Sequence, residues 1–146
     1  MSALFEHSPW VEERADARPS SGDRHVDLMA VVNEATPEEQ LALIRAHPEL
    51  AGKAAVDGSL TQASAAEQAS AGLDRLSQEE FDRFHALNAA YREKFGFPFI
   101  ICVRLTGKAR ILAAMERRLA NDRDTEIATA LGEIGEIVRL RLEDRA

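Results

Sequence analysis

The sequence predicts an all-α protein, a single-domain bundle of about seven or eight helices over residues 1–146. Three observations lead to this prediction. Apolar residues recur with a helical period along most of the chain. Thr36, Ser64 and Ser77 are each followed three residues later by Glu, the pattern of a capping box that starts a helix. A single apolar run, Phe97–Val103, lacks the helical period and has no evident partner strand.

Composition and charge narrow the class of protein. Hydrophobic residues make up 45% and charged residues 29% of the chain, as in globular proteins. The net charge of −7 argues against non-specific nucleic-acid binding. Cys102 is the only cysteine, so an internal disulfide is excluded and a reducing compartment is favoured. No stretch has transmembrane length and the N-terminus does not resemble a signal peptide, so we expect a cytoplasmic protein without membrane contact.

The first two helices are expected on either side of a connector at 18–22. Ser8 followed by Pro9 reads as an N-cap and first helical residue. The second helix carries apolar residues at a spacing of three: Val26, Met29 and Val32.

The third helix has the strongest start and a sharp end. Thr36 begins a capping box with Pro37 at the first helical position. Pro48 disfavours helical geometry in the preceding residue, so the helix should stop at or just before His47. A titratable imidazole on a rigid helix end suits proton transfer near neutral pH. The alternative is that His47 only caps the helix C-terminus, where a cation is favoured.

The middle of the chain reads as a loop followed by two capped helices. Residues 52–61 are expected to form the loop, and capping boxes should start helices at Ser64 and Ser77, with Glu67 as the third helical residue after Ser64. Gly96 can terminate the second of these helices. One face of that helix carries Phe81, Phe84, Leu87, Tyr91 and Phe95.

Phe97–Val103 is expected to be extended and buried, because Pro98 forbids an ordinary helix interior. Its backbone polar groups then need partners. A polar ligand could supply them, or side chains and water could; the segment alone leaves both open.

Two further helices complete the bundle. One has an apolar stripe that ends near Asn121, and the last has a stripe that reaches Arg141 at a spacing of seven from 134. A guanidinium on this inward face needs an anion partner or a route to solvent, whereas Arg139 lies off the stripe and should be solvated. The two stripes are Ile111, Leu112, Met115 and Leu119, then Ile127, Leu131, Ile134 and Val138.

Several candidate chemistries can be weighed from the residues alone. The four histidines show no metal-binding spacing, so no metal site is expected. If Glu67 served only as a cap, its carboxylate would bond to a backbone N–H and would not be available for acid–base chemistry. Gln68 could instead orient an amide group of a ligand. Cys102 with His47 could form a nucleophilic dyad, although a thiol in an apolar run is usually inert.

A set of short motifs, spread in a fixed order over nearly the whole chain, resembles that of a known enzyme family. The sequence resembles 2-oxo-4-hydroxy-4-carboxy-5-ureidoimidazoline (OHCU) decarboxylases of the uric acid pathway. It departs from them at Glu49, where many members have Asp, and at Asp16 and Ser20, which replace aromatic residues. The motifs are Phe5–Val11, His47–Lys53, Ser64-x-x-Glu67-Gln68, Ala71–Leu73, Leu87-Asn88-x-x-Tyr91, Phe95–Val103, Asn121, Glu126 and Ile137-x-x-Leu140-Arg141-Leu142.

The resemblance implies an α-helical homodimer that converts OHCU, a small ureide, to (S)-allantoin without a cofactor. It implies that His47 and Glu67 form the acid–base pair. The substrate-binding residues that it implies are Pro48, Glu49, Ser64, Gln68, Phe99, Ile100, Ile101 and Arg141.

Two other functions remain open at this point. A non-catalytic helical interaction domain would keep the apolar stripes but would not need His47, Glu67 and Arg141 to converge. A thiol-dependent hydrolase would require Cys102.

Overall fold

The fold is all-α, as the sequence predicts. The computed structural model describes residues 4–5, 8–47, 49–50 and 62–145. Within these ranges there are seven α-helices, one 3₁₀ turn and no strand. In chain order they are α1 (Trp10–Asp16), α2 (Arg24–Glu34), α3 (Pro37–Arg45), α5 (Gln62–Ser70), α6 (Gln78–Phe95), η1 (Val103–Leu105), α7 (Lys108–Arg118) and α8 (Arg123–Arg145).

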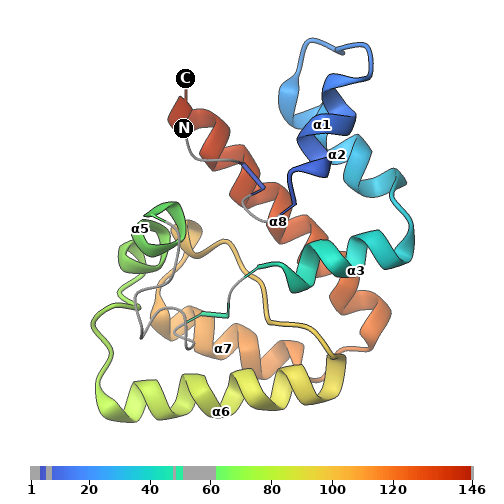
Figure 1. The fold of residues 1–146 in the computed structure, drawn as a ribbon. Coiled ribbons are helices and arrows are strands. Elements are labelled where there is room, and N and C mark those ends of the chain that lie inside the picture. The colour runs from blue at the N-terminus through green and yellow to red at the C-terminus, as the bar shows by residue number, and fades with distance from the viewer. Residues whose placement is uncertain (1–3, 6–7, 48, 51–61, 146) are drawn as a thin grey trace.

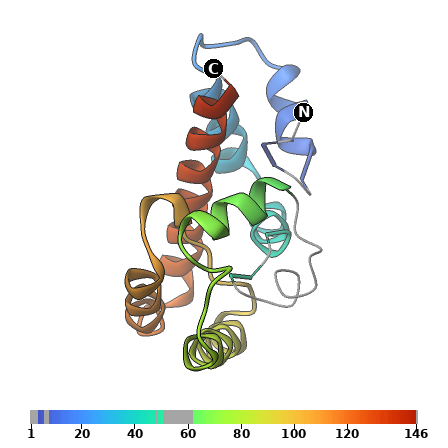
Figure 2. The same cartoon turned by 90° about the vertical axis from the view of Figure 1, so that its left-hand side faces the viewer.

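The 23-residue helix α8 runs through the middle of the molecule (Figure 1). Helices α1 and α2 pack against each other, and α2 and α3 both contact α8. Helices α6 and α7 lie side by side as a second layer, and α5 contacts η1. Figure 2 shows α8 upright and α6 and α7 almost end-on, so that pair runs across the direction of α8. The described helices include none that is both long and apolar enough to cross a bilayer.

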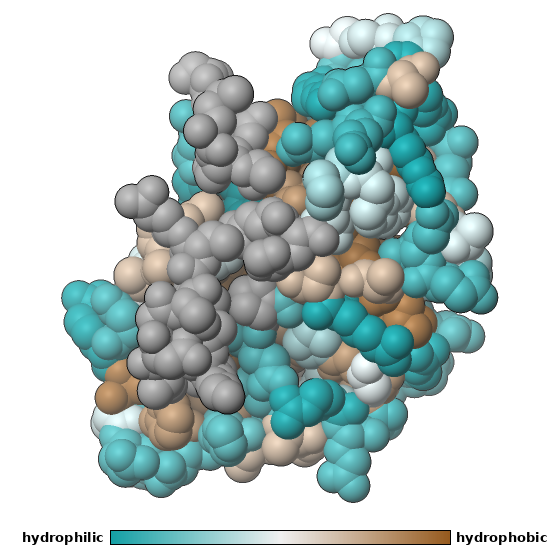
Figure 3. All heavy atoms as spheres, in the orientation of Figure 1, coloured by the Kyte–Doolittle hydropathy of each residue, from teal (hydrophilic) through white to brown (hydrophobic). Residues whose placement is uncertain are grey.

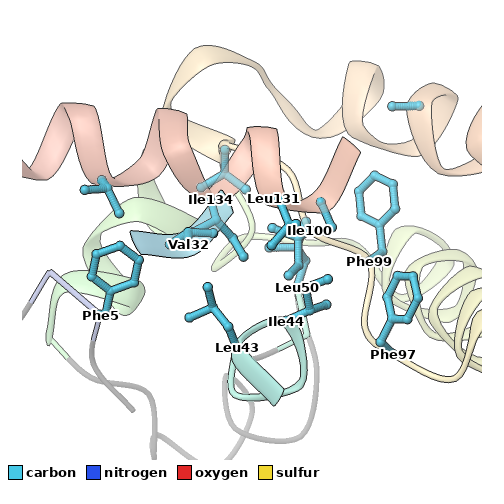
Figure 4. Close-up of a cluster of buried hydrophobic side chains, with 14 of the residues drawn as sticks. Phe5, Val32, Leu43, Ile44, Leu50, Phe97, Phe99, Ile100, Leu131 and Ile134 are labelled. Atoms are coloured by element: carbon cyan, nitrogen blue, oxygen red, sulfur yellow. The ribbon is translucent and has the colours of Figure 1, made fainter. Parts of the chain in front are cut away.

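The hydrophobic core forms where α2, α3 and α8 meet the segment between α6 and α7. Figure 4 shows Leu43 of α3, Val32 of α2 and Ile134 of α8 pointing toward one another. Ile100 lies beside them, and Phe99 extends the cluster toward α6. Hydrophilic residues dominate the visible surface over α6 and the α1–α2 corner, with apolar atoms in the seams (Figure 3).

Four predicted helix boundaries are confirmed. Thr36 and Ser77 both form complete capping boxes, their hydroxyls accepting from backbone N–H groups over 3.1 Å. Helix α6 ends at Gly96, whose φ of 81° is left-handed and favours glycine. Helix α3 ends at Arg45, two residues before His47, as the following proline requires.

Two other sequence predictions are wrong. Ser8 does not cap α1, because Pro9 occupies the N-cap position and no side chain caps there. Ser64 does not start a helix: α5 already begins at Gln62, so Ser64 lies inside it and Glu67 is not a capping residue. Along the predicted spacing in α2, Val32 is buried and Met29 is partly buried, whereas Val26 is 52% exposed. The residues that α2 buries are Leu28, Val31 and Val32.

The apolar run after α6 is buried and forms neither helix nor strand until Val103, which begins η1. In Figure 1 this stretch crosses from the end of α6 back toward α5. The loop expected over 52–61 lies outside the described residues.

Candidate active site

A pocket lies where the end of α3, one face of α5, the chain through η1 and the C-terminal half of α8 meet. These four parts of the chain contribute both apolar and charged side chains. Its lining residues are His47, Leu50, Ser64, Glu67, Gln68, Phe99, Ile100, Ile101, Cys102, Val103, Arg104, Ile137 and Arg141.

His47 contributes a half-buried imidazole to this pocket. Its Nδ1 atom lies 2.9 Å from the carbonyl oxygen of Leu43, one helical turn earlier. A carbonyl can only accept a hydrogen bond, so Nδ1 carries the proton of the neutral ring and Nε2 is the basic atom. The end of α3 therefore sets both the position and the tautomer of the imidazole.

Glu67 and Arg141 form a two-pronged ion pair inside the pocket. Arg141 Nε donates to Glu67 Oε2 over 2.9 Å, and Nη2 donates to Oε1 over 2.7 Å. Arg141 Nη1 also donates to the carbonyl oxygen of Leu4 over 3.1 Å. The two side chains are 13% and 10% exposed. Arg141 therefore has the anion partner that its inward position required and does not extend to solvent.

Helix α5 presents three polar residues of one face to the pocket. Ser64, Glu67 and Gln68 stand at the i, i+3 and i+4 positions that share a helix face. Ser64 and Gln68 are each 5% exposed. A hydroxyl, a carboxylate and a carboxamide thus lie together on a rigid element, which suits recognition of a ligand rich in amides.

Of the residues that follow His47, the structure describes Glu49 and Leu50. Glu49 is absent from the described pocket lining, and its carboxylate forms an ion pair with Arg92 of α6. The next residue, Leu50, lines the pocket and its carbonyl oxygen accepts from Asn88 over 2.8 Å. Pro48 lies outside the described residues.

Side chains satisfy part of the backbone of Phe97–Val103. The carbonyl oxygen of Ile100 accepts from Arg118 over 2.7 Å, and the Cys102 N–H donates to Glu133 over 3.0 Å. The sequence left open whether a ligand or side chains and water satisfy this backbone. At these two groups, side chains do. The same stretch, from Phe99 to Val103, forms one wall of the pocket.

Cys102 lies in that wall with 2% of its surface exposed. Burial raises the pKa of its thiol, and the nearby carboxylate of Glu133 raises it further. A raised pKa lowers the fraction of reactive thiolate at neutral pH. The environment of Cys102 is that of an inert buried thiol and argues against a nucleophile.

Arg104 and Ile137 line the pocket and were not identified from the sequence. Ile137 could have been found, because it stands one turn before Arg141 on the same face of α8. Arg104 reaches the pocket through the 3₁₀ turn η1, which leaves no sequence signal. Its guanidinium pairs with Asp144 over 2.7 and 3.1 Å.

The described part of the chain holds no group of three or more His, Cys, Asp or Glu side chains that could bind a metal ion. The polar groups of the pocket lining are one imidazole, one carboxylate, one hydroxyl, one thiol, guanidinium groups and amides. They can move protons and bind anionic or carbonyl oxygens.

Comparison with known proteins identifies similar sequences over the whole chain. A family profile described as OHCU decarboxylase matches residues 1–143. The 2-oxo-4-hydroxy-4-carboxy-5-ureidoimidazoline decarboxylase of Haloferax volcanii is 46% identical over 145 residues, which are 97% of this chain and 84% of that protein. The uric acid degradation bifunctional protein PucL of Bacillus subtilis is 42% identical over 147 residues, 99% of this chain but only 29% of that larger protein.

A solved structure has the same fold. The crystal structure of (S)-allantoin synthase superposes with a TM-score of 0.73 at 28% sequence identity. The superposition covers 98% of this chain and 46% of that chain.

Proposed function

This chain belongs to the OHCU decarboxylase family, and we propose on that premise that it removes carbon dioxide from OHCU to form (S)-allantoin in urate degradation. The names of the similar proteins agree with each part of the proposal: the decarboxylase, uric acid degradation and (S)-allantoin. The observation from the structure that supports it is the convergence of His47, which follows α3, Glu67 of α5 and Arg141 of α8 on one pocket.

The reaction needs proton transfer but no external electron carrier. In OHCU, C4 holds a hydroxyl group and the carboxylate, and it adjoins a C5=N double bond. When the bond from C4 to the carboxylate breaks, its electron pair forms a C4=C5 double bond, and the C=N electrons move to the nitrogen, which takes a proton. The resulting enol loses its hydroxyl proton while C5 gains one, which gives allantoin. Because the substrate contains its own electron sink, we propose a cofactor-independent enzyme.

We assign the proton transfers to His47 and Glu67. Because Nδ1 of His47 donates to the Leu43 carbonyl oxygen, Nε2 is the basic atom when the ring is neutral, and it can then accept a proton and return it. Glu67 lines the same pocket, and its carboxylate is held in place by the two hydrogen bonds that it accepts from Arg141. Delivery of the C5 proton from one face only would produce a single hand of allantoin.

Substrate binding is assigned to the remaining polar groups of the pocket. Arg141 binds carboxylate or carbonyl oxygens, for which its planar fork is suited. Ser64, Gln68 and the backbone from Phe99 to Ile101 hold the ureido group and ring amides. Pro48 and Glu49 complete the proposed set of substrate-binding residues, and the Glu49 carboxylate also forms an ion pair with Arg92.

The experiment is to add the protein to freshly generated OHCU and follow allantoin by circular dichroism. We expect one hand to form faster than by spontaneous decay, which gives a racemate. Formation of racemic allantoin at the spontaneous rate would contradict the proposal. It would favour a non-catalytic helical domain, since the burial of Cys102 already argues against a thiol hydrolase.

The state of assembly follows the same resemblance, whereas the compartment follows from the sequence features considered above. We propose a homodimer in the cytoplasm, the latter favoured also by the single cysteine. Light scattering after size-exclusion chromatography measures the mass, and a value of 16.1 kDa rather than twice that would contradict the dimer.

A further inference from the structure

A buried polar cluster lies directly behind the pocket wall formed by Phe99 and Ile100. We define the Arg118 network as Tyr91, Arg118, Asn121 and Glu126. Glu126 is fully buried, Tyr91 is also fully buried, and Arg118 is 5% exposed. Burial raises the pKa of the Tyr91 phenol, as does its hydrogen bond to Glu126, so Tyr91 remains a neutral donor.

Glu126 is the common acceptor of this network. Its Oε1 atom accepts from the Tyr91 hydroxyl and from Arg118 Nε, the latter over 2.8 Å. Its Oε2 atom accepts from Asn121 Nδ2 over 2.8 Å. The carboxylate thus holds one edge of the Arg118 guanidinium in a fixed orientation.

The network is a costly way to fill the interior. A buried ion pair of this kind often contributes no more to stability than apolar side chains of similar volume. In addition, Arg118 Nη2 is buried without a hydrogen-bond partner in the described part of the chain. Stability alone therefore does not explain why a guanidinium occupies this position.

The other edge of the guanidinium contacts the pocket wall. Arg118 Nη1 donates to the Ile100 carbonyl oxygen over 2.7 Å. The centre of the guanidinium lies 4.3 Å from the centroid of the Phe99 ring, a cation–π contact. Both partners line the pocket, whereas Arg118 is not among the described lining residues. Arg118 thus holds the wall from its core side.

The direction of this hydrogen bond determines where the next N–H group points. The peptide bond between Ile100 and Ile101 is planar and trans, so its carbonyl and N–H groups point in opposite directions. Because the carbonyl points to Arg118 on the core side, the N–H of Ile101 points to the opposite side of the wall. The carbonyl is bonded to a cation, which polarises the peptide unit and strengthens its N–H as a donor.

We propose that Arg118 is a positioning residue for the reaction: it aims the N–H of Ile101 into the pocket as a hydrogen-bond donor to a carbonyl or carboxylate oxygen of the substrate. This inference rests on the proposed function. Arg118 does not touch the substrate but acts through the Ile100–Ile101 peptide. Glu133 supports the same stretch from α8 by accepting from the Cys102 N–H.

The test uses a variant in which the buried charges are removed together. Arg118→Met alone would leave Glu126 as an unpaired buried charge and could prevent folding. Arg118→Met with Glu126→Gln leaves the Arg118 network without a charge. The carboxamide introduced by the second substitution can still accept from Tyr91 while Asn121 turns its amide. We expect a folded protein whose KM for OHCU rises and whose affinity for (S)-allantoin in calorimetry falls about three- to tenfold, the effect of one hydrogen bond. Wild-type KM and wild-type affinity in the folded double variant would overturn the proposal.

A matched control separates positioning from stability. Val31→Ala removes buried methyl groups from α2, a helix that contributes no residue to the described pocket lining. It should lower Tm yet leave the allantoin affinity of the folded protein unchanged. If Val31→Ala weakens allantoin binding as much as the double variant does, the effect is one of stability and the proposal is wrong.

A measurement on the wild-type protein keeps the proposal testable even if the double variant does not fold. In an amide NMR titration with (S)-allantoin, the Ile101 N–H should move downfield as it gains an acceptor. An Ile101 signal unchanged at saturation would refute the proposal while leaving the decarboxylase function intact. By contrast, a wild-type protein that forms only racemic allantoin and binds none would refute the proposed function itself.

Discussion

Arg141 and Glu67 stand 74 positions apart in the chain, yet they form a bidentate ion pair in the pocket. Arg141 Nε donates to one carboxylate oxygen of Glu67 over 2.9 Å, and Nη2 donates to the other over 2.7 Å. Each side chain therefore neutralises the charge of the other. A substrate carboxylate that binds Arg141 must share the guanidinium with Glu67. Changes at either residue are expected to alter both stability and turnover.

His47→Ala should abolish stereospecific turnover without unfolding the protein. Loss of a general acid–base group lowers the rate by about 10²–10⁴. The rate is measured from the dichroism of the allantoin formed, and folding from Tm. His85→Ala is the control, since His85 is exposed on α6 and should keep full activity. A folded His47→Ala protein with near-wild-type activity would remove His47 from the mechanism.

Glu67→Gln should lose activity and also stability. The carboxylate is needed for proton transfer, and its removal leaves the buried guanidinium of Arg141 with one neutral acceptor in place of two charged oxygens. An imperfectly satisfied buried polar group costs about 1–3 kcal/mol. Urea unfolding measures this loss. A double-mutant cycle with Arg141→Gln should show strong coupling between the two positions. Additive effects would contradict the ion pair, and an active Glu67→Gln enzyme would return Glu67 to a purely structural role.

Arg141→Lys should be clearly impaired, and Arg141→Ala more so. A lysine keeps the charge but loses the planar fork that contacts Glu67 and the Leu4 carbonyl. Calorimetry with (S)-allantoin and steady-state kinetics provide the measurement. Arg139→Ala is the matched control, because Arg139 is 42% exposed and pairs only with Glu136 and Glu143 in the described structure. Equal losses at 139 and 141 would mean that overall charge, rather than a specific contact, is responsible.

Cys102→Ser should retain substantial activity, because the thiol is buried and protonated. Its pKa is raised in the folded protein, so folding favours the protonated thiol. The free energy of unfolding should therefore fall as pH rises above the ordinary thiol pKa of about 8.5. Between the unfolded and folded pKa values the unfolded chain has lost this proton and the native one has not. Denaturant unfolding at several pH values should show a shallower fall in Cys102→Ser. An inactive, folded Cys102→Ser protein would instead support a thiol mechanism.

Local sequence signals succeeded where the structure depends on neighbours within one helical turn. The capping boxes at Thr36 and Ser77, the left-handed Gly96 and the helix end before Pro48 are of this kind. The same signal failed at Ser64, although its pattern is equally good. A capping serine must adopt an extended backbone, and at Ser64 the helix had already begun at Gln62.

The pocket itself depends on contacts that no local pattern encodes. The sequence identified His47, Glu67 and Arg141 as candidates, partly through a family resemblance, but it did not show that Glu67 and Arg141 pair. It predicted a buried apolar wall at Phe97–Val103 without identifying Arg118 or Glu133 as the side chains that hold it.

The amino-acid sequence by itself thus determined the helical class, most helix ends and the inward position of Arg141, because helical hydrogen bonds and caps join residues three or four apart. Tertiary structure alone decided which charges meet, which backbone groups are held and that Glu49 turns to Arg92. Those choices depend on how whole helices pack, because packing brings distant parts of the chain together. They also depend on the free energy of burying a charge, which stays low only where a residue from a distant part of the chain pairs with that charge.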